Sequence, residues 1–115
     1  MGKDSVYLKH ILDAINVIEE YIKGIDFEEF QEHKNKLIQD GVIRELEIVG
    51  EAVKNISADF RNFHGEIPWK DTAGMRDKLI HVYFGVDLEA VWQTVQKDLP
   101  KLKVQIENIL AEIVN

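Results

Sequence analysis

Hydrophobic side chains recur at intervals of three and four along most of the chain, the pattern of α-helices that bury one face. The first stretch of this kind runs from about Ser5 to Lys23. It stops before Gly24, a residue suited to ending a helix. Its apolar positions are Leu8, Ile11, Ile15, Ile18 and Ile22. An apolar face this regular predicts a long helix that packs against a partner helix.

A second long helix is predicted from about Lys36 to Ile56. Its apolar positions are Val42, Leu46, Val49, Val53 and Ile56. Gly50 lies inside this helix, where glycine costs about 1 kcal/mol relative to alanine. That cost is tolerable if the glycine lets another backbone come close. Gly41 is predicted to mark a bend or a late start of the helix.

A short acidic helix is predicted between these two. Asp26 followed by Glu29 resembles a capping box, and the helix then continues through Phe27 and Phe30. Its acidic side chains are predicted to form a solvated face.

In the second half of the chain, the periodicity breaks over residues 57–74 (SADFRNFHGEIPWKDTAG), which are predicted to form a connection. A further helix is predicted from Met75 to Phe84, ending at Gly85. Asp87 is a good N-cap for the helix that follows.

Asp98 with Pro100 indicates one more helix start, and that final helix reaches about Ile113. The sequence therefore predicts an all-α fold, a single-domain helical bundle over residues 1–115 with four long helices and one or two short ones.

Composition narrows the possible functions. The 115 residues hold no cysteine, which excludes disulfides, thiolate metal sites and a cysteine nucleophile, and fits a reducing compartment. No apolar run has the length of a membrane span, and the N-terminus lacks the apolar stretch of a secretory signal. We therefore expect a cytoplasmic protein that does not act in a membrane.

The net charge of -7 argues against non-specific nucleic-acid binding over the whole surface, because such binding depends on Lys and Arg neutralising phosphates. The charge is unevenly distributed. The segment from Arg61 to His81 carries +1, whereas the rest of the chain carries -8. This segment contains the residues with the most chemical interest.

Arg76, His81 and Tyr83 lie within eight positions in MRDKLIHVYFGVD, residues 75–87. On a helix, Arg76 and Tyr83 would be about 20° apart around the axis and roughly 10 Å apart along it. His81 would lie about 140° from Arg76. Cleaving a phosphodiester without a metal needs a base, an acid and positive charge, and one histidine supplies only one proton carrier. Two copies related by a two-fold axis would supply two histidines and two arginines, so a homodimer is predicted.

Spacing alone favours a simpler interpretation, in which Arg76 and His81 lie on the solvated face of an ordinary helix. His10, His33 and His64 are scattered without the spacing of a helical metal site, and Trp69 and Trp92 are predicted to be packing residues. No phosphate-binding glycine loop, Ser-His-Asp set or zinc motif is present. Neither a metal nor a cofactor is expected.

Three stretches carry a resemblance that changes this balance. They are ELEIVGEAVKNIS at 45–57, IPWKDTAGMRDKLIHVYFGVD at 67–87 and VWQTVQKDLPKLKVQI at 91–106. With the Arg-x4-His-x-Tyr pattern of residues 76–83, here called the signature segment, the chain resembles HepT-like toxins. These form a branch of the HEPN (higher eukaryotes and prokaryotes nucleotide-binding) superfamily.

The resemblance implies a homodimer whose signature helices face each other across a cleft, with a metal-independent endoribonuclease site there. Arg76 would hold the scissile phosphate, and His81 would act as general acid or base. Asp77 would orient Arg76 or groups of the second copy. The implied partner is a minimal nucleotidyltransferase antitoxin that transfers AMP to Tyr83, and the substrate is RNA.

Two alternatives remain at this point. The chain could be a non-catalytic nucleotide- or substrate-binding subunit of a two-protein nucleotidyltransferase, which would explain the acidic surface. It could also be a plain helical interaction domain, in which changes to the signature segment affect stability alone.

Overall fold

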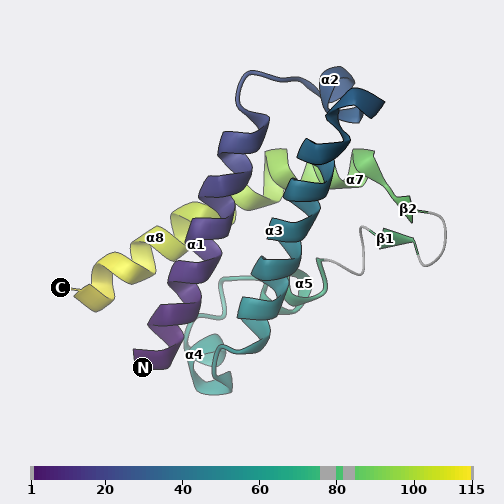
Figure 1. Cartoon of the computed structure of the whole chain (residues 1–115). Helices are drawn as coiled ribbons and strands as arrows, with labels where there is room; N and C mark the ends of the chain where they lie inside the picture. Colours follow the sequence, from purple (N-terminus) through teal and green to yellow (C-terminus); the bar gives the residue numbers. More distant parts are fainter. Residues whose placement is uncertain (1, 76–79, 82–84, 115) are drawn as a thin grey trace.

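Two long antiparallel helices, α1 (Gly2–Ile22) and α3 (Lys36–Lys54), lie side by side at the centre of the molecule and make its most extensive packing contact (Figure 1). A third long helix, α8 (Leu99–Val114), crosses α1 on its other side. The computed structural model describes residues 2–75, 80–81 and 85–114. Within these residues, the predicted all-α helical bundle is confirmed.

The core forms where the apolar faces of these three helices meet. The four apolar positions predicted for α1 from Leu8 to Ile18 are fully buried, and Ile22 packs against the cluster from its edge. All five predicted positions of the second long helix are buried as well. From α8, Leu102, Ile106 and Ile109 complete the cluster. Because helical periodicity determines which side chains share a face, these buried positions could be predicted from the sequence.

The link between α1 and α3 follows its predicted chemistry. Gly24 adopts a positive φ of 80° just after α1 ends. In α2 (Phe27–Gln31) the capping box is confirmed. The Glu29 backbone N–H donates to Asp26 Oδ1 at 2.9 Å, and the Asp26 N–H donates to Glu29 Oε1 at 3.3 Å. Phe30 is buried beside Trp92, with ring centroids 5.1 Å apart, which agrees with the packing role predicted for that tryptophan.

A short 3₁₀ turn, η1 (His33–Asn35), leads into α3. The buried amide of Gln39 fastens α3 to this turn and to α2, because its Nε2 donates to the carbonyl oxygens of Phe30 at 2.8 Å and Glu32 at 3.0 Å.

The segment 57–74 differs from its prediction as a connection, since it contains α4 (Ala58–Phe63) and α5 (Trp69–Ala73). Each helix is too short for a periodic pattern to stand out in the sequence. Ser57 caps α4 by accepting a hydrogen bond from the Phe60 N–H at 3.2 Å. Trp69 anchors α5 because its ring is buried and its Nε1 donates to the His64 carbonyl oxygen at 2.9 Å.

The last part of the chain is helical from Leu88 to Val114. The Asp87 N-cap is confirmed, with the Ala90 N–H donating to Asp87 Oδ1 at 3.0 Å at the start of α7 (Leu88–Gln93). The helix start predicted at Asp98 with Pro100 is confirmed, because α8 begins at Leu99, and a π-helical turn, η2 (Thr94–Asp98), joins α7 directly to it. Pro100 cannot donate the usual helical hydrogen bond, and the wider π-helical turn before it lets the helix continue past the proline.

The predicted helix from Met75 to Phe84 is wrong at its described C-terminal part. Ile80–His81 (β1) pairs antiparallel with Gly85–Val86 (β2), in the register Ile80 to Val86 and His81 to Gly85. β-branched and aromatic residues dominate this stretch and favour extended backbone over helix. The described part of the chain therefore has three long helices, where four were predicted.

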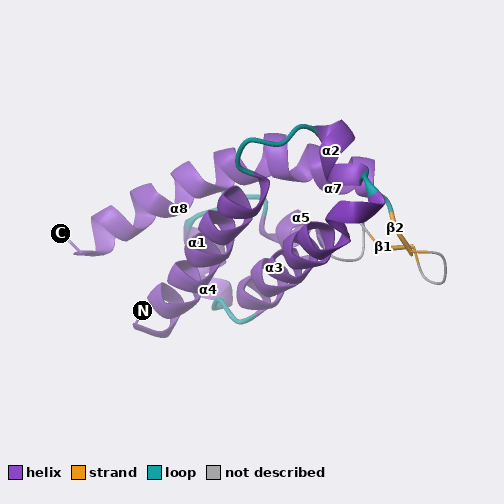
Figure 2. Ribbon diagram, turned by 45° about the horizontal axis from the view of Figure 1, so that its top comes forward, coloured by secondary structure: helices purple, strands orange, loops and turns teal. Residues whose placement is uncertain are grey.

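The two strands project to the side of α3, next to the start of α7 and outside the bundle (Figures 1 and 2). Their main contacts are with each other. Among the described residues, no helix is both long and apolar enough to cross a membrane.

Candidate active site

The signature segment lies between α5 and α7. Arg76, Asp77 and Tyr83 are outside the described residues, so the structure does not test their predicted roles. The backbone of His81 is described, and it lies in β1 opposite Gly85. Helical spacing predicted Arg76 and Tyr83 in one row of a continuous helix and His81 on another side of it. The backbone at His81 is extended, so that helical geometry does not apply there.

The backbone that leads into the signature segment is held tightly. Gly50 of α3 faces α5 so closely that a Cβ atom there would lie 3.2 Å from the carbonyl oxygen of Ala73. The predicted reason for this glycine, a close approach of another backbone, is confirmed. Thr72 is buried and its hydroxyl donates to the Pro68 carbonyl oxygen at 2.9 Å. Met75, the last described residue before the signature segment, is buried in the core.

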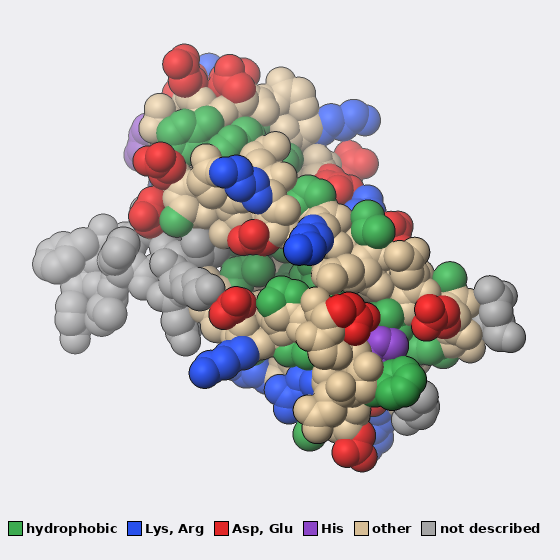
Figure 3. Space-filling model, turned by 180° about the vertical axis from the view of Figure 1, so that it is seen from behind, with side chains coloured by type: hydrophobic (Ala, Val, Ile, Leu, Met, Phe, Trp, Pro, Cys, Tyr) green, Lys and Arg blue, Asp and Glu red, His purple; other side chains and the backbone are tan. Residues whose placement is uncertain are grey.

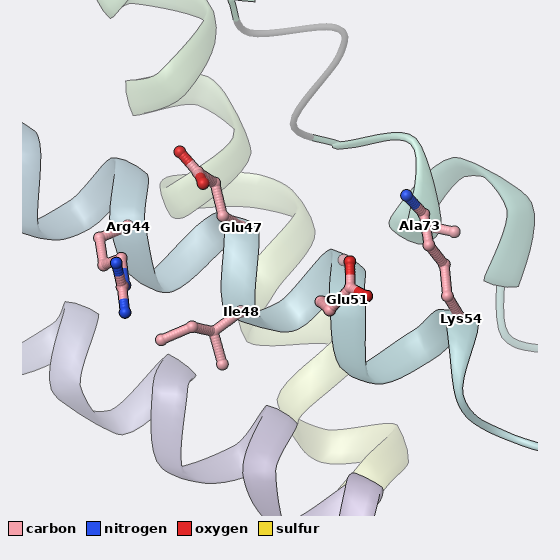
Figure 4. Close-up of a pocket in the computed structure, with 7 residues that line it drawn as sticks. Arg44, Glu47, Ile48, Glu51, Lys54 and Ala73 are labelled. Atoms are coloured by element: carbon pink, nitrogen blue, oxygen red, sulfur yellow. The ribbon is translucent and has the colours of Figure 1, made fainter.

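A hollow of about 330 Å³ opens between α3 and the end of α5 (Figure 4). Charged side chains of both signs border it. Arg44, Glu47, Glu51 and Lys54 come from one side of α3, and Lys54 extends toward Ala73 of α5. Ala73 borders this hollow and lies three residues before Arg76 in the sequence, so the two cations of the hollow lie beside the backbone that leads into the signature segment.

A second hollow, of about 320 Å³, lies where α5 meets η2 and α8. Met75 and Thr72 border it from one side, and Asp98, Lys101 and Gln105 from the other. The side-chain oxygen of Gln105 is buried and accepts no hydrogen bond from the described residues, while its Nε2 donates to the Glu66 carbonyl oxygen at 3.4 Å.

One hollow borders Ala73 and the other borders Met75, two of the last three residues before the signature segment. Sequence reasoning did not single out their charged residues. The available signal was the row Arg44, Glu47, Glu51 and Lys54, which are spaced by three and four positions on the polar side of a predicted helix. An ordinary solvated helix face carries such a row as well. Only the position of α5 beside α3 shows that these four residues border a hollow.

No group of three or more His, Asp or Glu side chains suited to a metal ion is found among the residues that the structure describes. Comparison with known proteins identifies the family. The sequence model described as "Ribonuclease HepT-like" matches residues 11–109, a span that includes both hollows and the whole signature segment. The chain belongs to the HepT-like ribonuclease family.

Curated relatives agree with this assignment. The chain is 52% identical over 103 residues to "Probable ribonuclease HepT" of Thermococcus cleftensis, covering 90% of this chain and 92% of that protein. It is 48% identical over 104 residues to a protein of Caldanaerobacter subterraneus subsp. tengcongensis named "Putative RNase", covering 90% of this chain and 91% of the relative.

A third relative has a different length. The chain is 50% identical over 114 residues to "Gamma-glutamylcyclotransferase and putative RNase" of Methanocaldococcus jannaschii, which covers 98% of this chain. The HepT-like chain spans 50% of the length of that protein. No solved structure matches the chain.

Proposed function

We propose that this HepT-like ribonuclease is the toxin of a toxin–antitoxin pair and cuts RNA internally, without a metal ion, at a site shared by two copies of the chain. The family match over residues 11–109 carries this proposal, because it spans Arg76, His81 and Tyr83 in the order of the signature. The short spacing also favours it, since all three residues lie in one connection between α5 and α7.

The chemistry needs one proton acceptor, one proton donor and one cation. His81 takes the proton of a ribose 2′-hydroxyl, whose oxygen then attacks the adjacent phosphorus. The corresponding histidine of the second copy gives a proton to the leaving 5′-oxygen. Arg76 stabilises the charge that develops on the phosphoryl oxygens, and Asp77 orients Arg76. The products are a 2′,3′-cyclic phosphate end and a 5′-hydroxyl end.

The position of the two strands supports a shared site. β1 and β2 contact chiefly each other and project beyond the bundle, so the two-fold related surface of a second copy can approach them without displacing the core. One histidine per copy at position 81 then becomes two per site. Isologous contacts of this kind are the commonest form of homodimer.

Regulation is proposed at Tyr83 by a minimal nucleotidyltransferase antitoxin. The Tyr83 hydroxyl oxygen attacks the α-phosphorus of ATP, a phosphodiester bond forms between that oxygen and AMP, and pyrophosphate leaves while the hydroxyl proton passes to a base of the antitoxin. A bulky anion seven positions from Arg76 would compete with RNA phosphate through both charge and volume.

The test measures cleavage of end-labelled RNA by purified dimer in the presence of EDTA. We expect cleavage with cyclic phosphate ends, a loss of at least a hundredfold in Arg76→Ala and His81→Ala, and unchanged cleavage in the exposed-histidine control His10→Ala. Mixing the two inactive variants at equal concentration tests the shared site. No cleavage by the unmodified protein, together with undiminished toxicity of both variants in cells, contradicts the proposal.

A second candidate is favoured by one observation, the net charge of -7, which suits RNA poorly. In that case the chain is a non-catalytic nucleotide- or substrate-binding subunit of a two-protein nucleotidyltransferase. Nucleotide binding by the complex that survives His81→Ala, without RNA cleavage, would identify this function.

Modification of Tyr83 is tested by measuring the intact mass of the chain after incubation with the nucleotidyltransferase and ATP, together with RNA cleavage by the same sample. The Tyr83→Phe variant should show no mass increase.

A further inference from the structure

A mostly apolar groove lies at the end of the bundle where α4 meets the first turn of α1 and the last turns of α8. Its volume is about 560 Å³, the largest of the three hollows described, and it shares no residue with the two beside the signature segment. Figure 1 shows α4 and the C-terminus on the side of the molecule away from the strands. The groove is therefore separate from the proposed catalytic site.

The apolar surface of the groove has a buried floor and an exposed edge. Phe60 and Ile109 form the floor, each about 4% exposed. Phe63 and Ile113 form the edge, and they are 83% and 42% exposed. Figure 3 shows hydrophobic side chains gathered beside a histidine at this end of the molecule, with acidic side chains around them. A contiguous apolar surface with a polar rim, as formed here by Phe63 and Ile113 beside the hollow, is typical of an interaction surface.

The groove is already formed in the isolated chain. The carboxylate of Asp4 accepts hydrogen bonds from the Ser57 backbone N–H at 2.8 Å and from the Ser57 hydroxyl at 2.9 Å, which fixes the start of α4 on α1. The His64 ring packs against Phe60 and Phe63, with centroid distances of 4.5 Å and 4.9 Å. A surface that is ordered in advance loses little conformational freedom when a ligand binds.

The charges at the rim all have one sign. Asp59 and Glu112 are exposed at the edges of the groove, and neither lysine nor arginine is among its described wall residues. RNA phosphates would be repelled from this surface. A second copy docking through the same groove would bring the acidic rims of both copies together, which is unfavourable. Charge complementarity instead calls for a basic ligand.

We propose that this groove binds a segment of a partner protein that places bulky apolar side chains on Phe63 and Ile113 and lysine or arginine beside Asp59 and Glu112. An amphipathic basic helix has this chemistry, with apolar anchors three and four positions apart on one face. The binding surface is independent of the signature segment, so it would allow a partner to be held while the proposed catalytic site remains open.

The experiment uses the full chain and a fluorescein-labelled synthetic helix with leucine and phenylalanine on one face and lysine on its flanks. A matched peptide carries glutamate in place of each lysine. Fluorescence anisotropy is expected to show the basic peptide binding at least tenfold more tightly than the acidic one at low salt, with the difference shrinking as salt is added. Equal binding of both peptides, or no binding of the basic one at millimolar concentration, overturns the proposal.

Two sets of variants locate the binding. Phe63→Ser should weaken binding of the basic peptide at least tenfold, whereas Leu37→Ser, which changes a leucine that is 86% exposed on α3, should leave it unchanged. Because both side chains are largely exposed, neither change removes core packing. The double variant Asp59→Lys and Glu112→Lys should reverse the preference toward the acidic peptide.

Other occupants give different results that would each contradict the proposal. If a second copy fills the groove, sedimentation will show that Phe63→Ser changes the oligomeric state. If RNA fills the groove, an unlabelled RNA oligonucleotide will displace the basic peptide from the wild-type chain. The oligonucleotide will also bind less tightly to Phe63→Ser than to the wild-type chain. Equal weakening by Leu37→Ser would show non-specific adsorption of the peptide.

Discussion

Gly50 and Ala73 bring α3 and α5 into backbone contact, since a Cβ atom at position 50 would lie 3.2 Å from the Ala73 carbonyl oxygen and 3.6 Å from that of Thr72. Ala73 is three residues from Arg76. This contact therefore sets where the chain enters the proposed catalytic segment, and a larger residue at position 50 must move α5.

Gly50→Val is expected to lower the free energy of unfolding by about 1–3 kcal/mol, because its branched side chain meets backbone that cannot yield as a flexible side chain would. Urea unfolding of the purified chain measures the change. Glu51→Val is the matched control, since it introduces the same side chain at the next, exposed position of α3. Because valine has a higher helix propensity than glycine, helix propensity alone would make Gly50→Val stabilising. Destabilisation by Gly50→Val no larger than that by Glu51→Val would contradict the role of the contact with α5.

The cations of the hollow shown in Figure 4 are expected to contribute to RNA binding if the proposed activity is correct. Alanine substitution of Arg44 or Lys54 in the catalytically inactive His81→Ala protein should weaken its binding of RNA. Each should also reduce the slope of log affinity against log salt by about 0.7, the value for one lost single-strand phosphate contact. Lys9→Ala removes an equal charge from the exposed side of α1 and should leave the slope unchanged.

Asp4 and Ser57 join α1 to α4, although they are 53 positions apart in sequence. Asp4→Ala should lower the free energy of unfolding by about 1–3 kcal/mol, because it leaves the Ser57 N–H without its acceptor in a partly buried position. Asp4→Asn, which keeps one acceptor oxygen, should have a smaller effect. Asp13→Ala removes an exposed carboxylate from the same helix and should change stability little, as measured by thermal or urea unfolding.

The Glu19–Lys103 pair links α1 to α8 with an Nζ–Oε1 distance of 2.7 Å. The hydrogen bond from Lys103 to Glu19 raises the pKa of Lys103 above its ordinary value of 10.5. A raised folded-state pKa gives stability that is fully present below pH 10.5 and is lost as the pH rises through the folded-state pKa. Glu19→Gln should remove this part of the alkaline loss. An unchanged pH dependence of unfolding in Glu19→Gln would contradict the assignment.

Local patterns correctly predicted the parts of the fold that depend on neighbouring residues. The buried faces of α1 and α3 follow from helical spacing, and the caps at Asp26 and Asp87 follow from side chains that reach a backbone N–H three positions away. The close-approach glycine at position 50 was also predicted, although its neighbour, Ala73, was not.

The short helices were missed because contacts distant in sequence stabilise them. α4 and α5 are too short to produce a periodic signal, and they are stabilised by Asp4 and by packing against Gly50. At Ile80 and His81 the helical spacing of apolar residues was misleading, because β-branched and aromatic residues there favour extended backbone, and the described backbone pairs with Gly85–Val86 outside the bundle. The helix start at Asp98 and Pro100 was predicted correctly, but the π-helical turn that joins α7 to α8 without a loop was not.

The sequence by itself determined the helical class, the two central apolar faces and the motif that relates Arg76, His81 and Tyr83, because periodicity, capping and motif spacing are properties of nearby residues. Only the tertiary structure decided that Arg44 and Lys54 border the same hollow as Ala73, and that Phe63 and Ile113 share a groove with an acidic rim. These relationships join side chains from separate helices, whose positions are determined by the packing of the whole core.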